Sequence, residues 1–107
     1  MDDLYAKFLP QFVTLARSRV ATAIAVATRR DQTATTTIVR ELHTLAGEAG
    51  LLGLGDVVPL ARDCERRAKA LHGSQAADDA EGLVAALRQL ERVIEGVAAT
   101  GPASSGT

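Results

Sequence analysis

The sequence predicts an all-α protein, a compact bundle of helices. Of its 107 residues, 20 are alanine and 13 are leucine, and both residue types are among the strongest helix formers. The one cluster of β-branched residues, at 35–39, runs directly into a helical pattern without the alternation of a strand. Because aromatic residues make up only 3% of the chain, we expect a core of small and aliphatic side chains that lets helices approach closely.

Composition and charge exclude several classes of protein. Hydrophobic residues make up 47% and charged residues 23% of the chain, which is typical of a folded domain. Twelve basic and 13 acidic residues give a net charge of -1, without the basic excess expected of a nucleic-acid-binding protein. No apolar run approaches the roughly 18 residues of a membrane span, and residues 1–10 are acidic rather than signal-like. We therefore expect a cytoplasmic domain without nucleic-acid partners or membrane insertion.

The first 30 residues predict two helices separated by a proline. Asp2 or Asp3 can cap a short helix, which Pro10 interrupts or restarts. A longer helix is expected at about 11–28, because its apolar residues recur at spacings of three and four. The apolar residues of these two helices are Leu4, Phe8, Leu9, Val13, Ala16, Val20, Ile24 and Ala27.

The third predicted helix begins after Asp31 or Thr33, either of which can serve as its N-cap. Its apolar face consists of Ile38, Leu42, Leu45, Ala49 and Leu52. Three glycines, Gly50, Gly53 and Gly55, mark its end.

The fourth predicted helix follows Gly55 or Asp56, accepts Pro59 in its first turn and stops at 72–73. Its apolar positions are Val57, Leu60, Cys64, Ala68 and Leu71. A fifth helix has Ser74, Asp78 and Asp79 as capping candidates and a bundle-like stripe of Leu83, Leu87, Leu90, Ile94 and Val97. The helical domain is thus predicted at 1–99, and residues 100–107 are expected to be a flexible tail or the start of a linker.

His43 does not fit the core pattern of the third helix. With 100° per residue, the apolar face of that helix is centred roughly 140° from His43, so the imidazole is expected to project outward. Gly47 lies one turn later and leaves the imidazole unshielded on that flank, although a glycine inside a helix costs about 1 kcal/mol relative to alanine. Further residues on or beside this outward patch are Thr36, Val39, Arg40, Ala46 and Gly50.

This arrangement indicates a group carrier. A neutral imidazole is abundant at physiological pH and is a nucleophile through a ring nitrogen. Because the sequence shows no acid or base partner for His43, we expect another protein to complete the chemistry. The remaining titratable candidates favour structural roles: His72 lies at a helix end, Cys64 lies on an apolar stripe, and two histidines with one cysteine form no recognisable metal-ligand set.

The segment 43–53 resembles the motif of histidine-phosphotransfer (HPt) domains, a family that includes the phosphotransfer domain of chemotaxis-type histidine kinases. That motif has a histidine, a hydrophobic residue two positions later, a lysine three later, and glycines four and ten later. His43, Leu45, Gly47 and Gly53 match it, whereas Ala46 stands at the lysine position. Asp31 and the pair 64–65 fit the family loosely, and the order of helices agrees over residues 2–99.

The resemblance implies an antiparallel four-helix bundle, here preceded by a short extra N-terminal helix. It implies that His43 is the phosphoacceptor of a two-component phosphorelay, taking a phosphoryl group from a histidine kinase or a receiver aspartate and passing it to the receiver domain of a response regulator. The domain would be a monomeric carrier rather than an autonomous catalyst. It would have no cofactor of its own, and its partner would supply Mg²⁺. The docking surface and phosphoryl access would involve Val39, Arg40, Ala46, Gly47 and Gly50.

Ala46 leaves two questions open. Arg40, one turn before His43, can substitute for the missing lysine if its guanidinium reaches the phosphoryl group. Alternatively, the chain is a degenerate HPt-like module that docks a receiver or kinase without carrying phosphoryl. A purely structural or dimerising bundle would leave the outward histidine and its glycines unexplained. The basic residues Arg62, Arg66, Arg67 and Lys69 are interpreted as a solvated face, which an acidic receiver pocket can also favour.

Overall fold

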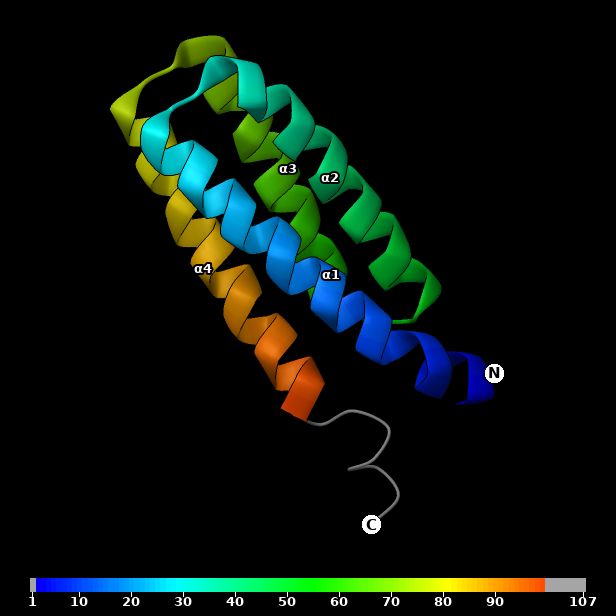
Figure 1. The fold of residues 1–107 in the computed structure, drawn as a ribbon. Coiled ribbons are helices and arrows are strands. Elements are labelled where there is room, and N and C mark those ends of the chain that lie inside the picture. Colours follow the sequence, from blue (N-terminus) through cyan, green and yellow to red (C-terminus); the bar gives the residue numbers. More distant parts are fainter. Residues whose placement is uncertain (1, 100–107) are drawn as a thin grey trace.

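In the computed structural model, the chain forms an antiparallel bundle of four consecutive helices (Figure 1). The structure describes residues 2–99, with side chains from residue 5 onward. The helices are α1 (Asp2–Arg29), α2 (Gln32–Leu51), α3 (Val57–Ser74) and α4 (Ala77–Ala99). Each of α1 and α3 packs against both α2 and α4. The predicted all-α bundle is therefore confirmed, and the predicted tail at 100–107 lies outside the described residues.

The prediction of a separate short helix before Pro10 is wrong, because α1 continues without a break through that proline. A proline inside a helix costs about 3 kcal/mol through its missing amide hydrogen and its ring. Leu9, Phe12 and Val13 flank Pro10, and all three are buried on one face of α1. Burying each such side chain contributes about 1.5–3 kcal/mol, so their combined burial outweighs the proline, which itself faces solvent.

The core runs the length of the bundle and follows the predicted stripes closely. On α2 the buried positions include Ile38, Leu42, Leu45 and Ala49, and on α4 they include Leu83, Leu87, Leu90 and Ile94. A few predicted core residues are only partly buried, namely Ile24, Leu52, Leu60 and Val97, and Phe8 is exposed. None of the helices that the structure describes is long and apolar enough to cross a membrane.

The two ends of α2 are determined by a side-chain cap at the start and by a left-handed glycine just after the end. At the start, the side chain of Asp31 accepts a hydrogen bond of 3.1 Å from the backbone N–H of Ala34. At the end, Gly53 has a φ of +70°, a left-handed conformation in which an L side chain is strained. The last glycine of the 43–53 segment is therefore required by the turn into α3.

The end of α3 lies one residue beyond the predicted end at 72–73. The helix continues past residues 72–73 to Ser74, and Gln75 then takes a left-handed conformation with its N–H bonded to Leu71 O at 2.8 Å. Asn and Gly are the usual residues at such a position, so Gln75 gave no stop signal in the sequence. The Ser74 hydroxyl accepts from the Ala76 N–H at 3.1 Å and also bonds the Asp79 carboxylate, just before α4 begins.

Replacing Asp31 by alanine should lower the free energy of unfolding by about 1 kcal/mol, because the Ala34 N–H loses its capping partner. Urea denaturation followed by circular dichroism measures this change. The matched control is Thr33→Ala, at the alternative candidate cap, which should stay within about 0.5 kcal/mol of the wild type. Equal losses in the two variants would contradict the assignment of the cap.

Candidate functional site

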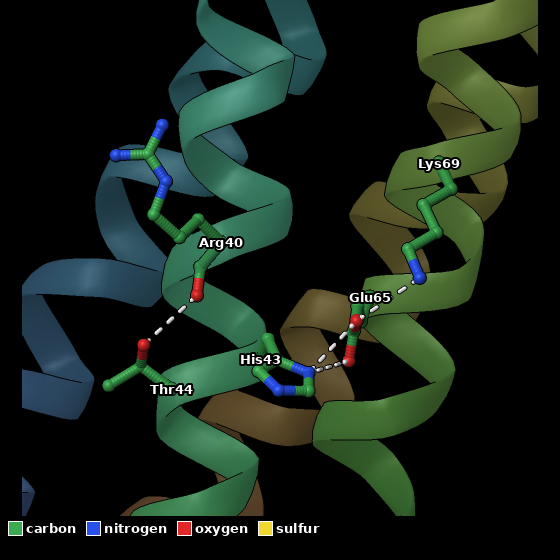
Figure 2. Close-up of polar contacts among 5 residues, drawn as sticks. All are labelled: Arg40, His43, Thr44, Glu65 and Lys69. Carbon is green, nitrogen blue, oxygen red and sulfur yellow. Dashed lines mark hydrogen bonds and ion pairs between the residues drawn. The ribbon is translucent and has the colours of Figure 1, made fainter.

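His43 lies near the middle of α2 and points away from the core. Its side chain is 78% exposed, while Leu42 and Leu45 beside it in the sequence are fully buried. The outward direction that the helical pattern predicts is thus present in the structure. The imidazole leans toward α3, the neighbouring helix, rather than standing free in solvent (Figure 2).

A carboxylate on α3 holds one ring nitrogen of His43. Nδ1 lies 3.2 and 3.3 Å from the two carboxylate oxygens of Glu65 (Figure 2). An ionised carboxylate can only accept hydrogen bonds, so in the neutral imidazole this contact assigns the N–H to Nδ1. The other nitrogen, Nε2, then keeps its lone pair. Since the Glu65 side chain is only 14% exposed, the carboxylate is well placed to fix both the tautomer and the orientation of the ring.

Glu65 also pairs with a lysine of its own helix. Lys69 Nζ lies 3.3 Å from Glu65 Oε2, one turn further along α3, and Figure 2 shows its ammonium directed toward the carboxylate. The contacts thus form a row from His43 through Glu65 to Lys69, with the carboxylate between an imidazole and a cation.

An open pocket between α2 and α3 surrounds this row. Its lining residues are His43, Ala46 and Gly47 from α2, and Arg62, Glu65, Arg66 and Lys69 from α3. The four residues from α3 recur at spacings of three and four, so they share one face of the helix. With three basic side chains and one acidic side chain beside a histidine, the lining suits an anionic group.

The three basic side chains of the pocket differ in what they bind. Arg66 is paired with Asp63 on its own helix. Asp63 also accepts a bond from Arg67 at 2.9 Å, and this bond, with that from Arg66, holds the pKa of its carboxyl below its usual range. Lys69 contacts Glu65. Arg62 is exposed and forms no ion pair with any side chain that the structure describes.

The predicted site residues are only partly brought together. Gly47 lines the pocket, and a Cβ built on it would meet no atom within 4 Å, so packing does not require a glycine there. Ala46 also lines the pocket but is only 4% exposed. Val39 and Gly50 do not line it. Figure 2 shows the guanidinium of Arg40 directed away from His43.

The sequence did not single out the α3 residues of this site, which are Arg62, Glu65, Arg66 and Lys69. Cys64 occupies a core position of α3, so its neighbour Glu65 had to lie at the edge of that buried face. A sequence cannot show which side chain of α2 meets that edge, because the register between α2 and α3 depends on the turn at 52–56.

The other candidate side chains have structural surroundings. Burial raises the pKa of the Cys64 thiol to about 12, which keeps it protonated and unreactive near neutral pH. His72 Nδ1 lies 3.2 Å from Gln32 O and 3.4 Å from Thr35 Oγ1, tying the end of α3 to the start of α2. Within the part of the chain that the structure describes, no group of three or more His, Cys, Asp or Glu side chains is placed to hold a metal ion.

Comparison with known proteins gives one match. The sequence model of the Hpt domain matches residues 7–100, which includes most of α1 and all of α2, α3 and α4. Neither the curated proteins nor the solved structures give a match to the chain. Because the family match extends over nearly all of the sequence, the chain belongs to the Hpt domain family, whose members serve phosphotransfer in phosphorelays.

Proposed function

We propose that His43 is the phosphoacceptor of this domain and that Nε2 is the atom that carries the phosphoryl group. The observation that supports this assignment best is the contact between Nδ1 and Glu65. It leaves the lone pair on Nε2, in a side chain that is 78% exposed. A partner can therefore present a phosphoryl group to Nε2 without any rearrangement of the bundle.

In the forward step, the Nε2 lone pair attacks the phosphorus of a receiver aspartyl phosphate, or the γ-phosphorus of ATP bound to a kinase. The N–P bond forms as the P–O bond to the leaving group breaks, and its electron pair leaves with the aspartate carboxylate or with ADP. The proton on Nδ1 stays in place, so the ring gains positive charge beside Glu65. In the reverse step, a receiver carboxylate attacks phosphorus and the N–P electron pair returns to Nε2.

The partner supplies the rest of the chemistry. The pocket around His43 is open and offers positive charge, but within the described residues no cluster of ligands is placed to hold a metal. We assign Mg²⁺ to the receiver domain or the histidine kinase that docks here, and the carrier role to this chain. Because the phosphoryl group derives from ATP, the exchange belongs in the cytoplasm.

The direct test is phosphoryl transfer to the 107-residue chain from a panel of phosphorylated receivers and ATP-charged histidine kinases in Mg²⁺. The label should be stable in base and labile in acid, as a phosphoramidate bond is. Trypsin should place it on peptide 41–62, which contains His43 and no other histidine. Label on a different peptide would contradict the assignment. Binding without any label would favour the docking-module alternative, which Ala46 in place of lysine suggests.

Gly47 should matter for access to His43 and not for the fold. Gly47→Leu places a side chain one turn after His43, so we expect transfer to slow about tenfold through misplacement of the incoming group. Its free energy of unfolding should stay equal or rise by up to about 1 kcal/mol, because leucine favours helix more than glycine does. Gly73→Leu is the matched control, since Gly73 also lies in a helix with open space around it but outside the pocket. Equal transfer rates in the two variants would argue against an access role.

A further inference from the structure

A phosphoryl group on His43 would need positive charge beside it, and the residue at the lysine position of the motif does not supply this charge. A phosphoryl group carries about -1.5 to -2 charges near pH 7. The residue three positions after the histidine is Ala46, a side chain without charge that is 4% exposed. The guanidinium of Arg40 is directed away from His43 (Figure 2). Neither residue places a positive charge beside the imidazole.

The neighbouring helix does place positive charge there. Glu65 Oε2 lies 3.2 Å from His43 Nδ1 and 3.3 Å from Lys69 Nζ, so one oxygen atom connects the ammonium to the imidazole. The Lys69 side chain is 62% exposed, so little packing holds its stem in one position. Arg62 flanks Glu65 on the other side, lines the same pocket, and is unpaired among the side chains that the structure describes.

We propose that Lys69 and Arg62 of α3 supply the positive charge that stabilises the phosphoryl group on His43, in place of the lysine that this chain lacks at position 46. The inference rests on the proposed function, since it concerns the same imidazole. When Nε2 is phosphorylated, the ammonium of Lys69 reaches from the carboxylate to a phosphoryl oxygen, and Arg62 approaches from the opposite side. Arg66 lines the pocket as well, but its partner Asp63 lies outside the pocket, whereas the partner of Lys69 is the carboxylate that contacts His43.

These side chains contribute little to folding, which makes substitutions interpretable. The Lys69–Glu65 contact is a pair spaced by four residues on a helix whose lysine is 62% exposed, and such a pair contributes little to stability. Glutamine is a good helix former. Lys69→Gln, Arg62→Gln and the double variant should therefore remain folded, and circular dichroism checks this.

The experiment uses phosphoramidate as a small phosphoryl donor, so that no partner protein affects the result. Labelling of the 107-residue chain should slow about fivefold in Lys69→Gln and about tenfold in the double variant. Lys69→Arg should stay near the wild type, because it keeps the charge. Arg88→Gln on α4 is the matched control, since it removes the same charge from a residue that is paired with Glu91 on the helix diagonal to α2. The differences should shrink in high salt, which screens exposed charges.

A second measurement separates a direct contact from an effect through Glu65. In ³¹P NMR, the pH midpoint of the phosphohistidine signal should rise by about 0.5 in the double variant. Loss of a cation near the phosphoryl group favours its more protonated form and therefore raises the midpoint. If the substitutions acted only by disturbing Glu65, no cation would have been lost beside the phosphorus and the midpoint would not rise for that reason. Rates and midpoints equal to those of Arg88→Gln would overturn the inference. Absence of label on wild-type His43 from every charged receiver and kinase of the panel would instead refute the proposed function.

Discussion

Replacing His43 by glutamine should remove the phosphoryl label completely and leave the free energy of unfolding within about 0.5 kcal/mol of the wild type. A glutamine amide has no lone-pair nitrogen with which to form an N–P bond. Because the His43 side chain is 78% exposed and lies outside the core, its loss removes no buried contact. The glutamine N–H₂ group can still donate to Glu65.

Both histidines of the chain should be compared in this experiment, because only their surroundings distinguish them. His72→Gln should keep the label and should lose about 1 kcal/mol of stability, since His72 contacts Gln32 and Thr35 across helices. Labelling by a charged kinase or receiver, together with urea denaturation of each variant, gives both readouts. Label that persists in His43→Gln, or that disappears in a folded His72→Gln, would move the phosphoacceptor away from His43.

The helices and the outward direction of His43 could be predicted from spacing alone. Each helix keeps its apolar residues at intervals of three and four, and this periodicity fixes which face is buried. The positions of Leu42, Leu45 and Ala49 therefore determine that His43 points outward, before any tertiary contact is known. The turn at Gly53 could also be predicted from the sequence, because a glycine just after an apolar stripe marks the end of a helix.

Features that depend on contacts between helices could not be predicted in this way. Whether Pro10 divides α1 depends on how much Leu9 and Phe12 bury against the other helices, which a local pattern does not show. The partner of His43 depends on the register between α2 and α3. A helical wheel places Arg40 on the side of His43, but it does not give the direction of a long side chain or the residues of the next helix.

Glu65 should have the largest effect on transfer among the residues that contact His43. It contacts Nδ1 of the ring, and its negative charge would lie beside an imidazole that becomes positive if the proposed N–P bond forms on Nε2. Glu65→Gln keeps an acceptor oxygen and loses the charge, so we expect transfer to slow about tenfold. Glu65→Ala loses both, and we expect a decrease of about 100-fold, equivalent to about 2.7 kcal/mol in the activation free energy.

The ranking of the transfer rates of the wild type, Glu65→Gln and Glu65→Ala is more informative than either rate alone. If Glu65 acts as a positioning residue, the maximal transfer rate falls from wild type to Gln to Ala, while the concentration of receiver needed for half-saturation stays constant. Nitrogen-15 NMR of His43 should show the share of the Nδ1–H tautomer falling in the same order. Glu91→Gln on α4, which removes a carboxylate paired with Arg88, should change none of these quantities. Equal rates in Glu65→Ala and Glu91→Gln would mean that the imidazole needs no orientation by α3, and that the exposed position of His43 on α2 is sufficient for transfer.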